Sequence, residues 1–414
     1  MRHRHARILA AAAGVVALAV APAAVATGEE EAVPAVTFAR TGAEQVVFDY
    51  DAASGGSCDT SATGDLPDAA ARAFRDAAGK VHLIATHHRH WASISTGTSL
   101  DSVARDCAHM IYEAGNDPDP ATYDNRGWLE SFYTLDGRTI HALVAMDYHP
   151  RHYDKPCGTM PADASRCWYG TTVQATSTDG GYSFTSPAPG TPRFIAGVPY
   201  QADPAVTATG GAFVPSNIVV GPDGALYATL SMEPRELQAG GTCLIRTTAA
   251  ALGNPAAWRA WDGDGFDVQF ASPYPSVPDD PENHVCTPVG VGRLQRPVRS
   301  LIEVEGHDLY IAISHGVLPG DPAIKVLAST STNLVDWTPP QAVMDLPRYG
   351  QNGESCSTHS GAVRYQYPSL LDPQSTSRNF NTTGTTAYIY ATRVAYCAGF
   401  NRDLVRIPIS ITVS

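Results

Sequence analysis

Four carboxylates lie at the ends of short apolar runs, where side chains from separate strands can converge. They are Asp68, Glu130, Asp147 and Glu233. Glycoside hydrolysis generally uses two carboxyl groups, one to protonate the leaving oxygen and one to act as base or nucleophile. These residue types therefore predict acid–base chemistry on a sugar, with Glu233 as the acid and Glu130 or Asp147 as the base or nucleophile.

The stretch HLIATHHRHW, residues 82–91, places four histidines around one apolar run. A zinc site needs three or four ligands that point at one ion. His87 and His88 are consecutive, and consecutive side chains on a strand point to opposite faces. We therefore predict that His87 and His88 hydrogen-bond sugar hydroxyls and that the protein needs no cofactor. A calcium ion held by oxygen ligands in a central channel remains an alternative.

Arginines and aromatic residues extend the candidate site. Arg72, Arg299 and Arg393 could together hold a substrate carboxylate through fork-like hydrogen bonds, or could instead form ion pairs with nearby acidic residues. Ring faces on which sugars could stack are offered by Trp91, Trp128 and Tyr148. The remaining predicted substrate-binding residues are His149, Asn217 and His315.

A repeated strand must position these residues. One seven-residue pattern occurs five times, as VHLIATH (81–87), IHALVAM (140–146), LYATLSM (226–232), LYIAISH (309–315) and AYIYATR (387–393). In the first four copies a glycine-containing turn joins this segment to a preceding apolar segment, which is the signature of a β-hairpin. The turn glycines are Gly79, Gly137, Gly224 and Gly306.

Segments between the hairpins supply further strands. TTVQATSTDGGYSF (171–184) and KVLASTSTNLVDWT (325–338) follow the second and fourth hairpins, so each unit has room for four strands. Four strands repeated five times predict an all-β fold, a five-bladed β-propeller, with a two-sheet sandwich as the alternative. Segments 44–50 and 403–413 could complete one blade together. Four polar residues stand seven positions before the turn glycines and predict a polar axial channel: Arg72, Glu130, Asn217 and Arg299.

Two short motifs resemble those of known propeller families. STDGGYSF (177–184) is similar to the Asp box of the sialidase superfamily. STNLVDW (331–337) resembles a blade motif of five-bladed arabinanase, xylosidase and invertase-type glycosidases, with Asn333 in place of an aspartate. In those families both motifs stabilise a turn on an outer strand. The resemblance implies a Glu acid on the third blade, which Glu233 fits, and an Asp base on the first, for which Asp68 is the candidate although Arg72 holds the deeper position.

The N-terminus predicts export. Three arginines precede an apolar run over residues 8–20, and small residues end at Ala26, as in a secretory signal peptide. We expect a signal peptide over residues 1–26, a flexible segment over 27–43 and a single propeller domain over 44–414. All eight cysteines follow the signal, and an even number in an exported chain predicts four disulfides, with Cys157–Cys167 and Cys356–Cys397 as the expected pairs.

The charge of the chain bounds its partners. The formal net charge is −13, and it becomes −16 without residues 1–26 because 25 basic and 41 acidic residues remain. Such a surface repels nucleic acids and anionic lipids. We expect a carbohydrate substrate, no nucleic acid, no membrane and a monomer.

Together these features predict a secreted carbohydrate-active enzyme, a glycoside hydrolase acting on extracellular poly- or oligosaccharide in a central cleft. Two alternatives stay open. One is a polysaccharide lyase or sialidase-like enzyme acting on an acidic sugar, and the other is a non-catalytic propeller that binds a glycan or a protein.

Overall fold

Glycine turns organise the chain into antiparallel hairpins. The hairpins are β3 (Pro67–Arg75) with β4 (Val81–His88), β7 (Arg126–Tyr133) with β8 (Ile140–Tyr148), β12 (Val219–Val220) with β13 (Leu226–Glu233), and β16 (Ser300–Val304) with β17 (Tyr310–Leu318). The four predicted turn glycines have φ angles from 73° to 81°, a region that L side chains rarely adopt. The prediction of these hairpins is therefore confirmed.

The computed structural model describes residues 33–50, 66–88, 91–155, 157, 167–186, 193–203, 209–347, 363–395 and 401–414. Of residues 86–88, 91 and 107 it describes the backbone alone. Residues 33–414 form one compact unit. The predicted signal peptide lies outside the described residues.

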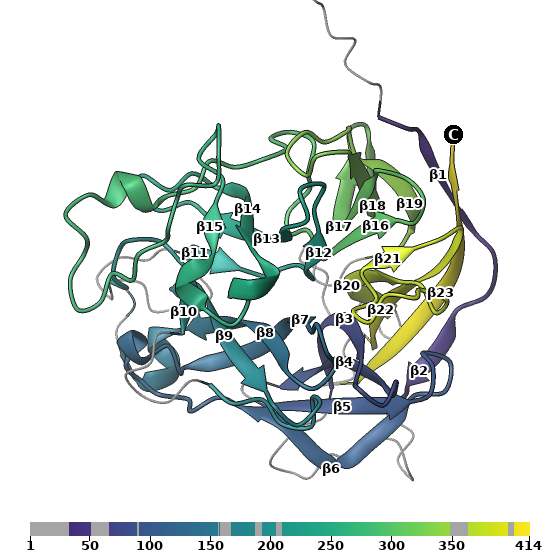
Figure 1. Cartoon of the computed structure of the whole chain (residues 1–414), viewed down its shortest axis with the longest axis horizontal. Coiled ribbons are helices and arrows are strands. Elements are labelled where there is room, and N and C mark those ends of the chain that lie inside the picture. Colours follow the sequence, from purple (N-terminus) through teal and green to yellow (C-terminus); the bar gives the residue numbers. More distant parts are fainter. Residues whose placement is uncertain are drawn as a thin grey trace, which may run out of the picture. The chain divides into compact units, whose positions relative to one another are not determined.

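The described strands form four sheets (Figure 1). One sheet has the order β3-β4-β5-β6, with β5 (Trp91–Gly97) and β6 (Ala104–Glu113). The largest has the order β15-β14-β13-β11-β9-β8-β7, with β10 paired to β9 and β12 paired to β13. Its other strands are β9 (Trp168–Ser177), β10 (Phe194–Ala196), β11 (Thr209–Phe213), β14 (Gly241–Thr247) and β15 (Arg259–Ala260).

The C-terminal half supplies the other two sheets. One has the order β19-β18-β17-β16-β21, with β18 (Asp321–Ser331), β19 (Gln341–Asp345) and β21 (Thr382–Thr383). The other has the order β1-β23-β22-β20, with β2 also paired to β23. Its strands are β1 (Val36–Arg40), β2 (Gln45–Phe48), β20 (Val363–Leu371), β22 (Thr386–Ala395) and β23 (Arg402–Val413).

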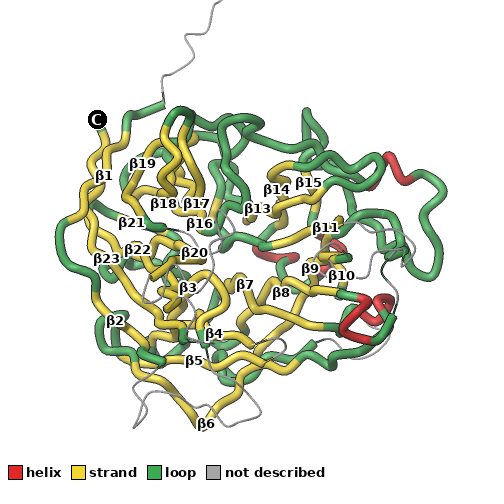
Figure 2. The backbone as a smooth tube through the Cα atoms, turned by 180° about the vertical axis from the view of Figure 1, so that it is seen from behind, coloured by secondary structure: helices red, strands yellow, loops and turns green. Residues whose placement is uncertain are grey.

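Helices are short and few in the part of the chain that the structure describes (Figure 2). They are the 3-10 helices η1 (Pro120–Thr122), η2 (Pro150–Tyr153), η4 (Ala249–Ala251), η5 (Pro255–Ala257) and η6 (Pro281–His284). The predicted all-β class is therefore confirmed.

Strands from both chain ends share one sheet. β2 pairs with β23 as the sequence predicts for segments 44–50 and 403–413. β1 also pairs antiparallel with β23, from Val36 opposite Val413 to Arg40 opposite Ile409. The prediction that residues 27–43 are flexible is therefore wrong for β1. The physical reason is that β23 would otherwise present unpaired backbone groups along its outer edge.

Neighbouring groups of strands contact one another in a cycle. β3 contacts β7, β9 pairs with β11, β12 contacts β16, β16 and β17 contact β20, and β20 contacts β3 (Figure 1). Apolar side chains fill the spaces between the groups: Phe74 packs with Phe132, and Ile311 and Ile389 belong to one buried apolar cluster. Strands covered on both faces in this way explain the continuous apolar runs of the repeated segment.

The two motif turns are held by their own side chains. Asp179 Oδ1 accepts hydrogen bonds from the backbone of Tyr182 and Ser183, each at 3.0 Å. Asn333 Oδ1 does the same for Val335 at 2.9 Å and Asp336 at 2.8 Å. Since an amide oxygen accepts as a carboxylate does, asparagine can replace the aspartate of the motif.

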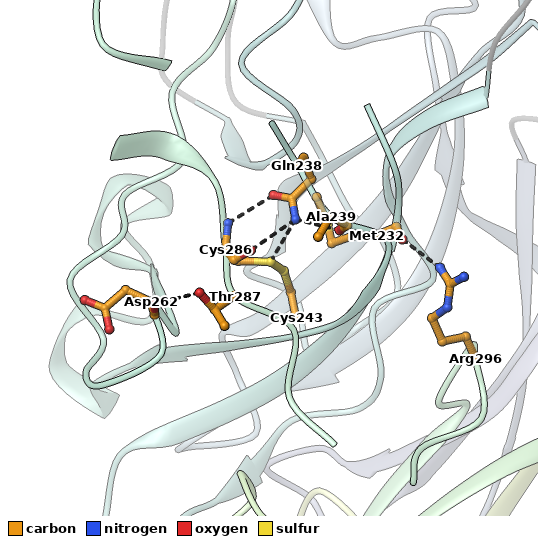
Figure 3. Close-up of a disulfide and its surroundings, with 8 residues drawn as sticks. All are labelled: Met232, Gln238, Ala239, Cys243, Asp262, Cys286, Thr287 and Arg296. Carbon is orange, nitrogen blue, oxygen red and sulfur yellow. Dashed lines mark hydrogen bonds between the residues drawn. A yellow bond between two sulfur atoms is a disulfide. The ribbon is translucent and has the colours of Figure 1, made fainter. Parts of the chain in front are cut away.

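Two disulfides lie in the described part of the chain. Cys157–Cys167 confirms a predicted pair, and Cys243–Cys286 was not predicted. Figure 3 shows Gln238 beside the second disulfide, where its amide binds the backbone of Cys286 in both directions, accepting at 3.0 Å and donating at 3.2 Å. The predicted Cys356–Cys397 pair lies outside the described residues.

Candidate functional site

Two of the four predicted axial residues connect strands of different hairpins. Arg72 is 3% exposed, and its guanidinium donates to the carbonyls of Glu130 at 2.8 Å and Arg299 at 2.6 Å. Asn217 donates to the carbonyl of Leu301 at 2.5 Å and accepts from its N–H at 2.7 Å. We predicted that Arg72 and Asn217 bind substrate. Their polar groups instead bind backbone atoms of neighbouring strands, and neither residue lines the cavity that contains Asp68, Glu130 and Asp147.

A cavity of about 290 Å³ gathers three of the four predicted carboxylates, Asp68, Glu130 and Asp147. The predicted binding residues Trp128, His149 and Arg299 also line it. Its remaining lining residues are Arg126, Ala145, Trp168, Phe213, Val214 and Tyr367. Residues on or next to β3, β7, β8, β9, β11 and β20, and in the segment before β16, therefore converge on one space.

Strand alternation explains part of this lining. Arg126 and Trp128 recur every second residue of β7, and Asp147 and His149 do so at the end of β8, so each set faces one side. Arg126 lies directly opposite Asp147 in the β7–β8 ladder. A cation and a carboxylate thus share one cross-strand position.

A β-bulge orients Glu130. Leu129 pairs with Val144 and Ser131 with Leu143, so Glu130 is the extra residue of β7. A bulge bends its strand and redirects a side chain, and bulges are common beside active sites. The register of β3 also shifts between Pro67 and Arg72, the interval that contains Asp68. The sequence contained no signal for either irregularity.

Glu130 has a buried carboxyl group, and one of its two oxygens lacks a hydrogen-bond partner among the described residues. Glu130 is 5% exposed, and this oxygen is Oε2. Burial raises the pKa of Glu130 to about 6, although the nearby cations Arg299 and Arg72 lower it in part. An unpaired buried oxygen at a cavity wall can accept a hydrogen bond from a ligand.

Asp147 has the larger pKa shift. Burial raises the pKa of the Asp147 carboxyl to about 7, while Trp168 and Arg126 oppose the rise and the negative charges of Glu130 and Asp68 add to it. A large share of Asp147 side chains therefore carries a proton near neutral pH. This is the state that a general acid needs.

The surroundings of Asp68 differ from those of Glu130 and Asp147, because several hydrogen-bond donors contact its carboxylate. Tyr367 Oη donates to Oδ1 at 3.0 Å, and Trp128 Nε1 donates to Oδ2 at 3.4 Å. Arg402 forms an ion pair with the same carboxylate. These contacts hold Asp68 as an acceptor, which suits a base or nucleophile.

Aromatic rings form the walls of the cavity. His149 stacks on Trp168 with ring centroids 5.1 Å apart, and Phe213 meets Trp168 edge-on at 5.0 Å. Burial, together with the neighbouring His152 and the cation Arg126, lowers the pKa of His149 to about 3. His149 is therefore neutral near pH 7 and can exchange hydrogen bonds with hydroxyl groups.

The backbone of two lining residues lies in the left-handed region. Val214 has a φ of 50° and Tyr367 a φ of 54°. For a β-branched or bulky residue this conformation costs about 1–3 kcal/mol, and such residues cluster at functional sites. Neither was predicted from the sequence, and neither were Arg126, Trp168 and Phe213.

Two glycines allow β9 and β11 to meet beside the cavity. Gly211 has a φ of 123°, and a Cβ there would lie 2.1 Å from the carbonyl oxygen of Gly170. A Cβ at Gly170 would lie 2.5 Å from the Phe213 ring. Only glycine at both positions lets the strands pair in parallel and places Phe213 at the wall.

The structure places other predicted site residues away from this cavity. The Glu233 side chain is 39% exposed at the end of β13, with its Oε1 3.5 Å from Arg296 Nη1. Arg393 binds Glu44 and Asp403, each at 2.7 Å, so it does not join Arg72 and Arg299 in one clamp.

Tyr148 and His315 are buried. Tyr148 stacks on Tyr153 at 5.7 Å and does not line this cavity. His315 Nε2 contacts the carbonyl oxygen of Leu346 at 2.7 Å. The side chains of His87, His88 and Trp91 lie outside the described residues, so the prediction for the HLIATHHRHW stretch remains a prediction.

Among the described residues, no group of three or more His, Cys, Asp and Glu side chains has the arrangement of a metal site. None of the described helices is long and apolar enough to cross a membrane.

Comparisons with known proteins give only distant similarities. No protein-family description and no curated protein matches the sequence. Among solved structures, a protein of unknown function from Dyadobacter fermentans is 10% identical, with a TM-score of 0.44, 92% of this chain and 100% of that chain covered. An endo-arabinase from Bacteroides thetaiotaomicron is 9% identical, with a TM-score of 0.45 and coverages of 83% and 94%. A glycosyl hydrolase from Bacteroides ovatus is 9% identical, with a TM-score of 0.43 and coverages of 84% and 84%. These values are too low to assign an activity.

Proposed function

We propose that this protein is an exported glycoside hydrolase built on a five-bladed β-propeller. The cycle of contacts between five hairpin-centred groups of strands supports the propeller. In this interpretation the largest sheet contains two blades that the β9–β11 pairing joins. Disulfides are typical of exported proteins and support export.

The observation that carries the function is the unequal environment of three carboxylates in one cavity. Glycosidases need one carboxyl that is protonated and one that is ionised at the same pH. Asp147, with its raised pKa, suits the acid, and Asp68, surrounded by donors, suits the base or nucleophile. The acid role that the sequence suggested for Glu233 passes to Asp147 in this proposal.

In the proposed reaction Asp147 gives its proton to the leaving oxygen as the glycosidic bond breaks. A water molecule supplies the hydroxyl group for the anomeric carbon and loses its proton to a carboxylate. Glu130 helps to keep Asp147 protonated, because its negative charge raises the pKa of the Asp147 carboxyl. Trp128 and Trp168 offer ring faces against which a sugar can stack.

The test is a reducing-sugar screen of the mature protein on plant and microbial polysaccharides, followed by single substitutions. Asp147→Asn and Asp68→Asn should each lower kcat about 100-fold or more on any glycan that the wild type cleaves. The matched control is Asp308→Asn, an exposed aspartate in the turn of the fourth hairpin. No release of sugar by the wild type, or full activity of Asp147→Asn, would overturn the proposal.

A second candidate is an enzyme that acts on an acidic sugar, a lyase or a sialidase-like hydrolase. It is favoured by the two arginines of the cavity lining, Arg126 and Arg299, because guanidinium groups bind carboxylates well. A lyase leaves an unsaturated product, so a rise in ultraviolet absorbance during digestion would distinguish it. Binding without turnover would instead indicate a glycan-binding protein.

A further inference from the structure

A second cavity of about 220 Å³ adjoins the carboxylate cavity. Three residues line both: Trp168, Arg299 and Tyr367. The remaining lining residues of the second cavity are Pro297, His315, Gln366 and Pro368. The two cavities therefore lie on either side of shared residues.

The second cavity has the composition of a binding site rather than a reaction centre. None of its described lining residues is a carboxylate. Trp168, Pro297 and Pro368 offer apolar surface, and the Gln366 amide can both donate and accept hydrogen bonds. Sugar rings combine an apolar face with hydroxyl groups at their edges, so this mixture suits a sugar.

An irregularity in β20 produces this lining. The β20–β22 register shifts between Gln366 and Ser369, and Tyr367 has a φ of 54°. In a regular strand consecutive side chains would point to opposite faces. Here Gln366, Tyr367 and Pro368 all line the second cavity, so the backbone departs from strand geometry at the residues that form the site.

The cavity sizes also favour a ligand that occupies both. Pockets for small ligands typically measure about 300–1,000 Å³. The carboxylate cavity, at about 290 Å³, lies at the lower end of this range and the second cavity, at about 220 Å³, lies below it, whereas together they lie within it.

We infer that the second cavity binds a second sugar residue of the substrate, joined to the first by the bond that the carboxylates cleave. This inference rests on the proposed glycosidase function and narrows its substrate class. The substrate is an oligo- or polysaccharide that spans both cavities, and Gln366 is a specificity-determining residue.

The test compares two substrates of the same sugar: a glycosyl fluoride, whose single-atom leaving group means that it needs only the carboxylate cavity, and a trisaccharide. Both sugar and linkage are those that the screen identifies. Gln366→Trp fills the second cavity and should lower kcat/KM for the trisaccharide about 10-fold or more, while kcat/KM for the glycosyl fluoride changes less than about 2-fold. Gln366→Ala should lower kcat/KM for the trisaccharide about 5-fold, the loss expected for one neutral hydrogen bond.

The matched controls are Gln269→Trp and Gln269→Ala, since Gln269 is exposed and lines neither cavity. Thermal midpoints equal to that of the wild type show that the variants fold. Equal losses on both substrates, or no loss on the trisaccharide in either Gln366 variant, would overturn the second sugar site and leave the glycosidase proposal standing. A wild type that cleaves neither substrate class would overturn both.

Discussion

Replacing Asp147 by asparagine should stabilise the folded protein at alkaline pH while it removes activity. The fold raises the pKa of Asp147 from its ordinary value of 3.8 to about 7. Between these values the folded state holds a proton that the unfolded state has lost, so the free energy of unfolding falls as the pH rises. Asparagine cannot ionise and does not suffer this loss.

The size of the effect follows from the pKa shift. A rise from 3.8 to about 7 corresponds to at most about 4 kcal/mol of lost stability above pH 7. Asp147 is half-buried and lies opposite Arg126, so solvent and the guanidinium compensate part of the loss. We therefore expect Asp147→Asn to be more stable than the wild type by about 2 kcal/mol at about pH 8, and equally stable near pH 4.

The assay is urea unfolding of the mature protein with its disulfides intact, followed by tryptophan fluorescence at several pH values. The exposed control Asp308→Asn should stay within about 0.5 kcal/mol of the wild type throughout. An Asp147→Asn variant that is no more stable than the wild type at about pH 8 would refute the reasoning. It would mean that the Asp147 carboxylate is well solvated or fully paired, and the case for Asp147 as the acid would fall with it.

Three further predictions concern the site and its supports. Activity should decline as the pH rises through about 7, because Asp147 must be protonated to act as the acid. A pH profile of kcat/KM that shows no decline near pH 7 would contradict this role. Arg72→Met should lower the free energy of unfolding, measured in urea, by about 3 kcal/mol, because it leaves the backbone carbonyls of Glu130 and Arg299 without their hydrogen-bond donor. Unchanged stability would show that water replaces the guanidinium. Replacing Cys243 and Cys286 together by serine should lower the free energy of unfolding by about 4 kcal/mol, as expected for a disulfide that closes a loop of 43 residues. Replacing Cys157 and Cys167 together by serine should lower it by less, because that disulfide closes a loop of only 10 residues.

Local rules explain why the hairpins could be predicted from the sequence. A turn glycine such as Gly79 has a positive φ, and its effect acts over a few residues. The apolar repeats around it likewise depend only on neighbours along the chain. The position of Glu130 seven residues before Gly137 also placed it among the candidate axial residues, and it lines the carboxylate cavity. The cysteine pair at residues 157 and 167 was predictable because its loop is short.

Site residues that depend on distant contacts were not predictable. Tyr367 donates to Asp68 across 299 residues of sequence, and nothing local marks either partner. Glu233 has the residue type of an acid and a suitable place in the repeat, but its side chain ends at the surface beside Arg296. Arg72 has the residue type of a ligand clamp, but tertiary packing uses it to hold backbone carbonyls.

The sequence by itself determined the all-β class, the glycine-turn hairpins and the joining of the two chain ends in one sheet, because residue type and short spacing control turns and strands. Only the tertiary structure decided which carboxylates share a cavity and which of them keeps its proton. The physical reason is that burial, β-bulges and contacts such as that of Arg402 with Asp68 arise from segments that meet only after the chain has folded.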